Sequence, residues 1–330
     1  MLGELAAALI SAAAAGAVTD LLTRRLEVRL RRKGMVGVDV HKPDRPEVPE
    51  GAGFAVFAGV SVGAALLWAL TRSAHSVGFV GASAVGALIG ALDDRVDLGG
   101  VLKPVLTLGV AAPLIAAGSL NPRPLLPLLG RARLFIAINV VVPAYAAVVT
   151  NAVNMYDALN GMMPLSVAIA CGAMAVIGAL TGGVATAQLA LVLGVALLAY
   201  YRYNRYPARV FSGNVGSLSV GAALSALPVY DGLEAFLLIA MLPFMVSGFF
   251  LLSSVGGLRE RRQIARRPVS VDSHGLIRAN PDPAAPITLI SILTLDRPKT
   301  EPEVVREAHL LTGLSALLAV LTLLALTPGW

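Results

Sequence analysis

The stretch HSVGFVGASAVGALIGALDDRVD, residues 75–97, joins an apolar run of membrane-spanning length to an acidic cluster. A helix needs about 20 mostly apolar residues to cross the hydrocarbon core of a bilayer. Asp93, Asp94 and Asp97 follow the apolar run directly, and carboxylates placed so close together near lipid are costly unless a cation lies beside them. The stretch predicts a span that ends in a charged site, with Lys103 or a divalent metal as the partner; a solvated acidic loop is the alternative.

The composition of the whole chain also indicates a membrane protein. Apolar residues make up 56% of the 330 positions and charged residues 14%, and the mean hydropathy is +0.76. Soluble domains are typically about 45–50% apolar. We therefore expect an all-α polytopic membrane protein with a single integral membrane domain over residues 1–330. Its ten expected spans are 2–22, 51–71, 75–92, 103–119, 134–150, 163–181, 184–200, 214–230, 233–256 and 308–327.

The distribution of basic residues predicts how these spans are oriented. Loops after odd-numbered spans hold 22 of the 26 lysines and arginines, and cytoplasmic loops normally carry this excess. The run 2–22 contains Glu4 and lacks a basic leader, so we expect a retained span rather than a signal peptide, with both termini outside. The net charge of +6 then reflects topology, and nucleic-acid binding is excluded.

The predicted cytoplasmic segments differ in character. The stretch 24–33 is basic and is expected to lie along the lipid headgroups. Residues 269–277 predict a small hairpin around a turn, and residues 287–295 predict a second β-like run, so the last loop is expected to fold as a small lid. The expected loops are 23–50, 93–103, 151–162, 201–214 and 257–307.

Amide and carboxylate side chains recur every third residue after the fifth predicted span. Asn151, Asn154 and Asp157 would lie on one side of a helix, and Asn160 and Gly161 would close the following turn. Oxygen donors of this kind suit Mg²⁺, which shares itself between protein and substrate phosphates. Hydrogen bonding between helices is the alternative explanation.

Two further segments carry residue types that bind phosphate. Residues 204–217 combine arginines, an aromatic residue and glycines just before a new span, where a helix start would favour an anion. In the basic run 259–267, Arg266 and Arg267 could grip a diphosphate, whereas the earlier arginines are expected to be membrane anchors. Cys171 lies alone in an apolar stretch and is expected to be a small core residue.

Taken in order along the chain, these motifs resemble the polyprenyl-phosphate N-acetylhexosamine-1-phosphate transferases of the glycosyltransferase 4 type. The resemblance is greatest to the eukaryotic and archaeal UDP-GlcNAc:dolichyl-phosphate GlcNAc-1-phosphate transferase branch. It implies transfer of GlcNAc-1-phosphate, or a related HexNAc-1-phosphate, from a UDP-sugar to a polyprenyl or dolichyl phosphate, with release of UMP. This is the first membrane step of lipid-linked glycan synthesis, as in N-glycosylation, and tunicamycin inhibits it.

The resemblance also implies partners and a location. Mg²⁺ is the expected cofactor, and Mn²⁺ is a substitute. A homodimer is consistent with the family. The expected location is the plasma membrane of a prokaryote, in particular an archaeon, or an ER-type membrane, with a cytoplasmic active site.

The same resemblance assigns roles to individual residues. Asp93, Asp94 and Lys103 match the catalytic positions, and Asn154 and Asn214 match the metal ligands. Asn160 corresponds to an amide near uracil and Phe211 to the aromatic residue that stacks on it, while Asp39, Lys42 and Glu50 form the first cytoplasmic motif. The remaining expected substrate-binding residues, drawn from the motifs above, are Asp97, Asn151, Asp157, Arg209, Gly213, Arg266 and Arg267.

The chain departs from the family pattern at two places. Asn214 stands where the family normally has an aspartate; an amide still coordinates Mg²⁺, but the loss of charge weakens binding unless Asp157 compensates. A catalytically impaired family member is therefore one alternative. The last loop lacks the histidine-rich motif of the bacterial branches, which favours UDP-GlcNAc over a muramyl-pentapeptide donor.

A cation-coupled transporter or flippase is the alternative from another functional class. Binding sites of such transporters tend to lie near the middle of the bilayer. The acidic clusters of this chain instead follow the ends of predicted spans.

Overall fold

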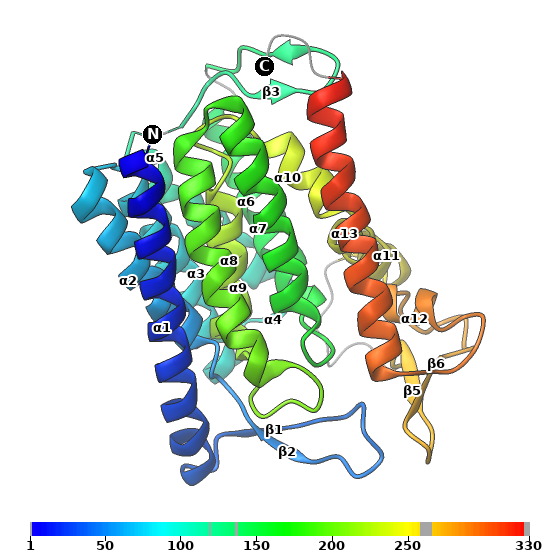
Figure 1. Ribbon diagram of the computed structural model, residues 1–330. Helices are drawn as coiled ribbons and strands as arrows, with labels where there is room; N and C mark the ends of the chain where they lie inside the picture. The colour runs from blue at the N-terminus through cyan, green and yellow to red at the C-terminus, as the bar shows by residue number, and fades with distance from the viewer. Residues whose placement is uncertain (1, 119, 136–137, 258–265, 327–330) are drawn as a thin grey trace.

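The computed structural model describes residues 2–118, 120–135, 138–257 and 266–326. These residues form a bundle of helices with short strands in its loops, as the all-α prediction expected (Figure 1). The helices are α1 (Leu2–Arg32), α2 (Phe54–Thr71), α3 (His75–Val96), α4 (Gly99–Thr107), the 3-10 helix η1 (Leu108–Ala111), α5 (Ala112–Ala116), α6 (Ile138–Tyr156), α7 (Met162–Thr181), α8 (Val184–Asn204), α9 (Gly213–Ala226), α10 (Glu234–Ala240), α11 (Leu242–Ser254), α12 (Leu289–Leu293) and α13 (Glu301–Leu326).

The helices make this an integral membrane protein with several spans. Within the described residues, eight helical segments are long and apolar enough to cross a membrane, and there are nine if α10 and α11 count as one span broken by a 76° bend. The sequence predicted ten. The difference lies in the expected span 214–230, because its helix α9 has only 14 residues, and the chain turns after Ala226.

Helix α9 differs from the others because protein surrounds it. Every residue from Gly216 to Ala226 is buried, and the helix packs most extensively against α3 and then against α6. At 1.5 Å per residue it is about 21 Å long, shorter than the hydrocarbon core. A helix enclosed in this way has no lipid-facing surface to match to the bilayer.

Helix α1 corrects the expectation for the basic stretch 24–33. The stretch does not turn to lie along the headgroups, because α1 continues without a break to Arg32. No proline or glycine interrupts it after Gly16. Two acidic residues hold the extended part to the bundle, Asp20 by an ion pair with Arg202 and Glu27 by one with Arg209.

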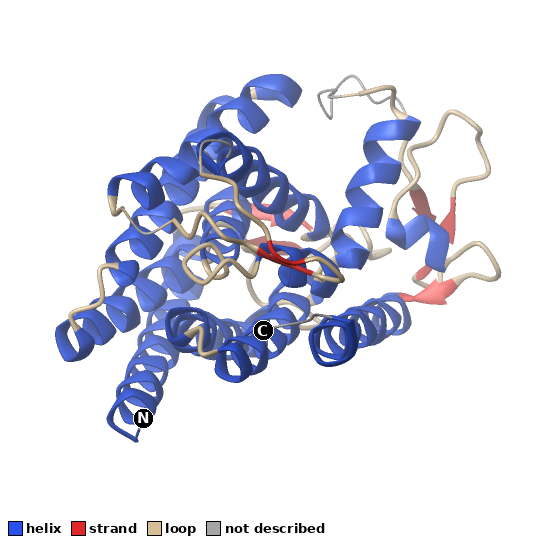
Figure 2. Cartoon of the chain, turned by 90° about the horizontal axis from the view of Figure 1, so that it is seen from above, coloured by secondary structure: helices blue, strands red, loops and turns tan. Residues whose placement is uncertain are grey.

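The strands are short and belong to the loops. Strands β1 (Val36–Val38) and β2 (Glu47–Pro49) pair antiparallel, as do β3 (Leu125–Leu126) and β4 (Gly130–Arg131). The last loop holds an antiparallel sheet of order β5-β6-β7, made of Val269–Val271, Leu276–Ala279 and Lys299–Thr300. Seen end-on, the strands occupy little of the cross-section of the bundle (Figure 2).

The prediction for the last loop was half right. The hairpin expected over 269–277 is confirmed by β5 and β6. The β-like run expected over 287–295 is wrong, since its centre forms α12. Thr288 and Ser291 form a capping box at the start of that helix, and a cap of this kind satisfies backbone N–H groups that would otherwise lack partners.

The loops that carry the sequence motifs gather at one end of the bundle, called the site end below. Helix α1 begins and α13 ends at the opposite end (Figure 1). At the site end α3 and α6 terminate and α9 begins. Asp94 near the end of α3 bonds the backbone of Asn214, and Asn154 near the end of α6 bonds its side chain.

Two glycines allow α3 and α9 to approach each other at the site end. A Cβ atom on Gly90 would lie 2.3 Å from the carbonyl oxygen of Asn214, and one on Gly86 would lie 2.5 Å from that of Leu218. Small residues commonly allow close helix packing in membranes. The spacing between Asp94 and the start of α9 therefore depends on these positions having no side chain.

We predict that Gly90→Ala lowers the melting temperature, because overpacking of this kind costs about 1–3 kcal/mol. Gly172→Ala is the matched control, since nothing lies within 4 Å of a Cβ at that position of α7 and alanine is the better helix former. Thermal unfolding of the purified protein in detergent measures both variants. Equal melting temperatures for the two would contradict the proposed constraint.

Candidate active site

Asp93 and Lys103 form an ion pair at the end of α3. The ammonium of Lys103 lies 2.7 Å from Oδ2 of Asp93, whose side chain is only 4% exposed. The other oxygen, Oδ1, accepts a hydrogen bond from the backbone N–H of Leu98 at 2.9 Å. Lys103 is thus the cationic partner of this acidic cluster, as one of the two sequence alternatives predicted.

The neighbouring carboxylate, Asp94, binds the start of α9. It accepts hydrogen bonds from the backbone N–H groups of Asn214 at 3.0 Å and Val215 at 3.2 Å. A helix N-terminus attracts anions because its first N–H groups lack partners within the helix. The sequence predicted phosphate at this position, whereas in the structure Asp94 already occupies these two donors.

The two predicted metal ligands are in contact. The amide nitrogen of Asn154, near the end of α6, donates to Oδ1 of Asn214 at 2.9 Å and to the hydroxyl of Ser217 at 2.7 Å. Asn151 does not join them, because its amide donates to the hydroxyl of Thr107 on α4 at 2.7 Å. The expected single row of Asn151, Asn154 and Asp157 is therefore divided among different neighbours.

Asp157 lies just beyond the end of α6 and faces the loop that precedes α9. Burial raises the pKa of its carboxyl to about 7, opposed by a hydrogen bond with Ser212 and increased by the negative charge of Glu50. The hydroxyl of Tyr200 donates to the same Ser212 at 3.3 Å. A carboxyl with this pKa is poised to gain from a nearby cation.

A second cluster, the Lys42 cluster, consists of Asp39, Lys42, Asn160, Tyr206 and Glu301. The ammonium of Lys42 donates to a carboxylate oxygen of Asp39, to Glu301 at 2.8 Å and to Oδ1 of Asn160 at 3.1 Å. It also lies 4.7 Å from the centroid of the Tyr206 ring. The side chains of Asp39 and Glu301 are 3% and 2% exposed.

Asn160 joins the parts of this cluster. Its backbone N–H donates to Glu301 at 2.7 Å, its amide nitrogen donates to Asp39 at 3.1 Å, and its Oδ1 also accepts from the N–H of Ala208 at 2.8 Å. Asn160 thereby connects the first loop (residues 23–50), the asparagine motif (residues 151–162), the nucleotide loop (residues 201–214) and the start of α13.

Glu301 is a residue that the sequence analysis missed. The available signal was an acidic residue at the start of the last apolar helix, on the same predicted side as the other motifs. Burial alone would lower the pKa of Lys42, but its hydrogen bonds with Asp39 and Glu301 outweigh this effect and raise that pKa above its ordinary value. Lys42 is therefore a fixed cation inside the cluster.

The segment before α9 is tied to the end of β2. The backbone N–H of Phe211 donates to the carbonyl of Pro49 at 2.8 Å, and its carbonyl accepts from Gly51 at 3.1 Å. Gly213 has a φ of +66°, and a Cβ there would lie 3.1 Å from the Cα of Gly51. Glu50 is bridged to Phe211 by the same pairing, so these two predicted substrate-binding residues are neighbours.

Other predicted site residues make contacts outside the Lys42 cluster. Arg209 makes a two-pronged contact with Glu27 of α1, and Asp97 caps the end of α3 with its backbone N–H. Arg266 pairs with Asp282 at 2.8 Å inside the last loop, and the side chain of the adjacent Arg267 is exposed.

Two further sequence predictions concerned residues outside the candidate site. The expected membrane anchors Arg259, Arg261 and Arg262 fall outside the described residues. Cys171 is buried among the helices, as expected for a small core residue.

The donors at the site end fit a hard cation by their chemistry. No group of three or more His, Cys, Asp or Glu side chains suited to a metal occurs in the described part of the chain. The site end instead offers mixed oxygen donors, with the amides of Asn154 and Asn214 in contact and the carboxylates of Asp94 and Asp157 attached to the same loop. Amide and carboxylate oxygens are ligands that Mg²⁺ accepts.

Comparison with known proteins finds a family match in the middle of the chain. The sequence profile of glycosyl transferase family 4 matches residues 76–231, the region that contains Asp93, Lys103, Asn154 and Asn214. Over these residues the chain is similar to glycosyl transferase family 4. The matched residues include the ends of α3 and α6 and the start of α9, which are the parts that meet at the site end.

Several similar proteins carry provisional names. A Saccharolobus solfataricus protein named as a UDP-N-acetylglucosamine–dolichyl-phosphate N-acetylglucosaminephosphotransferase is 28% identical over 221 residues, 66% of this chain and 69% of its own. A Sulfolobus acidocaldarius protein of the same name is 25% identical over 256 residues, 74% and 78% of the two chains. A Bacillus subtilis protein named as an undecaprenyl-phosphate N-acetylglucosaminyl 1-phosphate transferase is 27% identical over 227 residues, 68% and 62% of the two chains.

The Lys42 cluster leads to a prediction about stability. Lys42→Met leaves two buried carboxylates without their cation and should lower the free energy of unfolding by about 3–5 kcal/mol. Adding Glu301→Gln removes one of those charges and should restore part of the loss. Thermal unfolding of the two single variants and the double variant measures this coupling.

Arg297→Gln is the control, because Arg297 pairs with Glu303 of α13, the helix that carries Glu301, but the side chain of Arg297 is 55% exposed. That change should cost at most about 1 kcal/mol. A double variant no more stable than Lys42→Met would show that the two side chains are not coupled.

Proposed function

We propose that this protein transfers GlcNAc-1-phosphate, or a closely related HexNAc-1-phosphate, from a UDP-sugar to a polyprenyl phosphate of the dolichyl type. The observation that carries the proposal is that the ends of α3 and α6 and the start of α9 lie together, all within residues 76–231 that match family 4. There the Asp93–Lys103 pair, Asp94 and the Asn154–Asn214 contact lie at one end of a membrane bundle. Charged and amide groups at this end of the bundle can contact both a lipid phosphate and a soluble nucleotide.

The proposed reaction is a displacement at phosphorus. An oxygen of the lipid phosphate attacks the β-phosphorus of the UDP-sugar, and the bond from that phosphorus to the bridging oxygen breaks. UMP leaves with the bridging oxygen, and the sugar phosphate stays on the lipid as a diphosphate. When the lipid phosphate attacks as the dianion, the reaction balances without release of a proton. Such transfers depend mainly on positioning and charge neutralisation.

The residues at the end of α3 supply these functions in the proposal. Lys103, held by Asp93 at 2.7 Å and 22% exposed, is a cation for the diphosphate. Asp93 keeps that ammonium in place, and Asp94 fixes the start of α9 through two N–H groups. Asp94 also presents a carboxylate at the surface, next to the predicted metal ligands.

Mg²⁺ is the proposed cofactor, and Mn²⁺ is a substitute. Asn154 and Asn214 would hold it by their amide oxygens, assisted by the carboxylate of Asp157. When bound, the ion would neutralise negative charge on the diphosphate. Two amides bring less charge to the ion than an amide and an aspartate, so the affinity for the ion should be lower than with aspartate at position 214.

The uridine part is proposed to bind between the first loop and the segment before α9. Phe211 is half-buried, and its backbone is fixed on both sides by the end of β2, so its ring offers a positioned surface for stacking. Glu50 lies beside it. Lys42, Asp39 and Asn160 act in this proposal by holding the loops together behind that surface.

The names of similar proteins support the proposed donor and acceptor. Two of the archaeal relatives are named for UDP-N-acetylglucosamine and dolichyl phosphate, and the Bacillus relative for undecaprenyl phosphate. Arg266 and Arg267 are proposed to face the donor from the last loop, and for Arg266 this requires release from Asp282. The excess of lysine and arginine in the loops at the site end favours a cytoplasmic active site.

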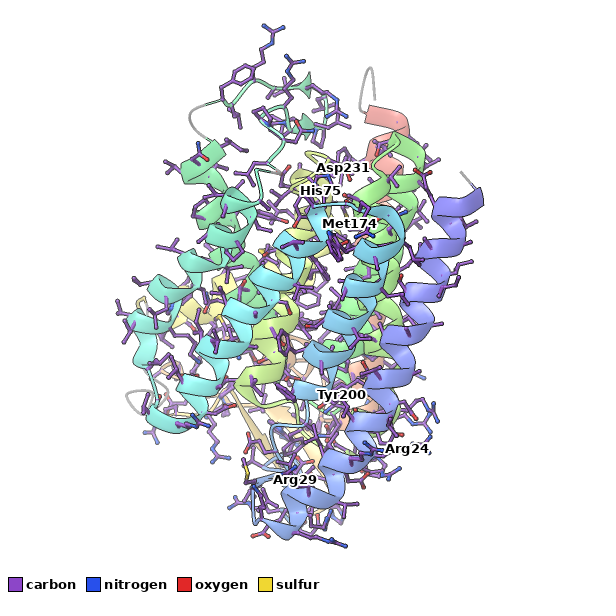
Figure 3. The ribbon with its side chains drawn as sticks, turned by 90° about the vertical axis from the view of Figure 1, so that its left-hand side faces the viewer. Arg24, Arg29, His75, Met174, Tyr200 and Asp231 are labelled. Carbon is purple, nitrogen blue, oxygen red and sulfur yellow. The ribbon has the colours of Figure 1, made fainter. Side chains whose placement is uncertain are left out.

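The transporter alternative is less well supported by the arrangement of charges. In the chain as described, the ion pairs and amide contacts assigned above lie where helices end. Figure 3 shows Tyr200 and Arg24 near the site end, whereas His75 and Asp231 lie at the opposite end. Transporter sites instead tend to use broken helices near the middle of the membrane.

We predict Mg²⁺-dependent release of UMP when the detergent-purified protein is given UDP-GlcNAc and a dolichyl phosphate. Asn214→Asp should lower the Mg²⁺ concentration needed for half-maximal rate, because it adds a charge to the proposed ligand pair. Chromatographic quantification of UMP measures both proteins over a Mg²⁺ series. Release by the variant alone would identify this chain as an impaired family member, and release by neither would contradict the proposal.

We also predict that Asp94→Asn and Lys103→Ala each reduce turnover by about a hundredfold or more, the scale of losing one electrostatic group at a transition state. Asp94→Asn keeps an acceptor oxygen for α9, so its melting temperature should change little. Lys103→Arg is the matched control, since it retains the positive charge beside Asp93. Near-normal turnover in Asp94→Asn or Lys103→Ala would exclude that residue from the catalytic group.

A further inference from the structure

An open hollow of about 620 Å³ lies on the outer face of α1 near the site end. Five cations line it: Arg24, Arg25, Arg29, Arg32 and Lys33. Arg25, Arg29 and Arg32 are spaced by four and three positions and so share one face of the helix, while Arg24 lies beside Arg25 and Lys33 directly follows the end of α1. Figure 3 shows Arg24 and Arg29 on this part of α1.

Apolar side chains share the hollow with the cations. Leu21 and Val28 contribute to its lining and are 48% and 50% exposed. Above them the same face continues with Ala17 and Ile10, which are exposed as well. An apolar strip long enough for a hydrocarbon chain thus leads directly into a group of cations.

The opposite face of α1 is occupied by protein. Asp20 bonds Arg202, Arg24 and the hydroxyl of Tyr203, and Glu27 bonds Arg209. The acidic residues of this part of α1 are therefore neutralised on the inner face. Of the five cations in the hollow, Arg24 is engaged by Asp20 and Tyr203.

The other four cations lack such partners. No side-chain ion pair or hydrogen bond joins Arg25, Arg29, Arg32 or Lys33 to any residue within 2–118, 120–135, 138–257 or 266–326. Arginine and lysine at lipid interfaces normally direct their charges toward water and phosphate. The face is thus an unneutralised basic surface.

The length of α1 sets the depth of this surface. Its 31 residues extend about 46 Å, compared with about 30 Å for the hydrocarbon core. The apolar part ends at Leu22, so Arg24 and Arg25 reach the level of the headgroups. Arg32 lies about 12 Å farther along the axis, beyond the core.

We propose that this face of α1 binds an anionic membrane lipid, with its phosphate held by Arg25, Arg29 and Arg32 and its hydrocarbon chain along Leu21, Ala17 and Ile10. Charge complementarity selects this occupant. The general excess of positive charge in cytoplasmic loops does not require the cations to share one face, nor to continue an exposed apolar strip. A second copy of the chain related by two-fold symmetry would bring the same cations against each other.

The test uses the full chain in nanodiscs made of phosphatidylcholine with and without phosphatidylglycerol. Native mass spectrometry after release counts the lipids that stay bound to the protein. The unmodified chain should retain phosphatidylglycerol in preference to phosphatidylcholine. Each arginine near an anionic headgroup contributes about 1 kcal/mol, which is about a fivefold change in retention. The variant Arg25→Gln/Arg29→Gln/Arg32→Gln should therefore lose the preference.

Arg31→Gln is the matched control for Arg32→Gln. The two residues are adjacent and exposed, but only Arg32 lines the hollow. The Arg32 variant should lose phosphatidylglycerol about fivefold, and the Arg31 variant should retain it. Because single changes at exposed positions leave the fold intact, this pair decides the question even if the triple variant unfolds.

Two outcomes would overturn the proposal. One is equal retention of phosphatidylglycerol by the Arg31 and Arg32 variants. The other is full displacement of the lipid by inorganic phosphate, which would identify a site for soluble anions. Since the readout is lipid binding, failure of the proposed transferase activity would not change either result.

Discussion

The arrangement of the site end depends on the carboxylate of Asp94 at the start of α9. Helix α9 is enclosed by protein, and its first N–H groups need acceptors that the helix itself cannot provide. Asp94 satisfies two of them from the end of α3, which fixes the height of α9 relative to α3. Gly86 and Gly90 let the two helices come close enough for this contact. Asn214 consequently faces Asn154, and the proposed metal ligands come together.

Buried charge imposes a second constraint on the loops. Asp39 and Glu301 are almost completely buried and come from opposite ends of the sequence, and one ammonium, that of Lys42, lies between them. Removing charges from water is costly unless they are paired and hydrogen-bonded. Asn160 completes the pairing, so the first loop, the asparagine motif and the last helix are held in one arrangement. Rigid loops of this kind suit a transfer reaction that depends on positioning.

Several features of the fold and site were predictable because they depend on local pattern. The apolar runs located the long helices, and Lys103 was one of the two expected partners of the acidic cluster, with which it forms an ion pair. The hairpin at 269–277 followed from its turn residues. The predictions of a span at 214–230 and a strand at 287–295 were wrong for different reasons. Because other helices enclose α9, its length need not match the thickness of the bilayer. The cap formed by Thr288 and Ser291 favoured a helix over a strand.

The sequence alone determined that this is a helical membrane protein whose central region resembles glycosyl transferase family 4, because apolar length, charge distribution and the order of motifs are properties of the chain itself. Only the tertiary structure decided which polar groups meet. It paired Glu301 with Lys42 across 259 positions, directed Arg209 to α1 rather than to the site, and gave α1 one neutralised and one basic face. These outcomes depend on which helices pack together, and each buried charge then takes the partner that the packing brings within reach.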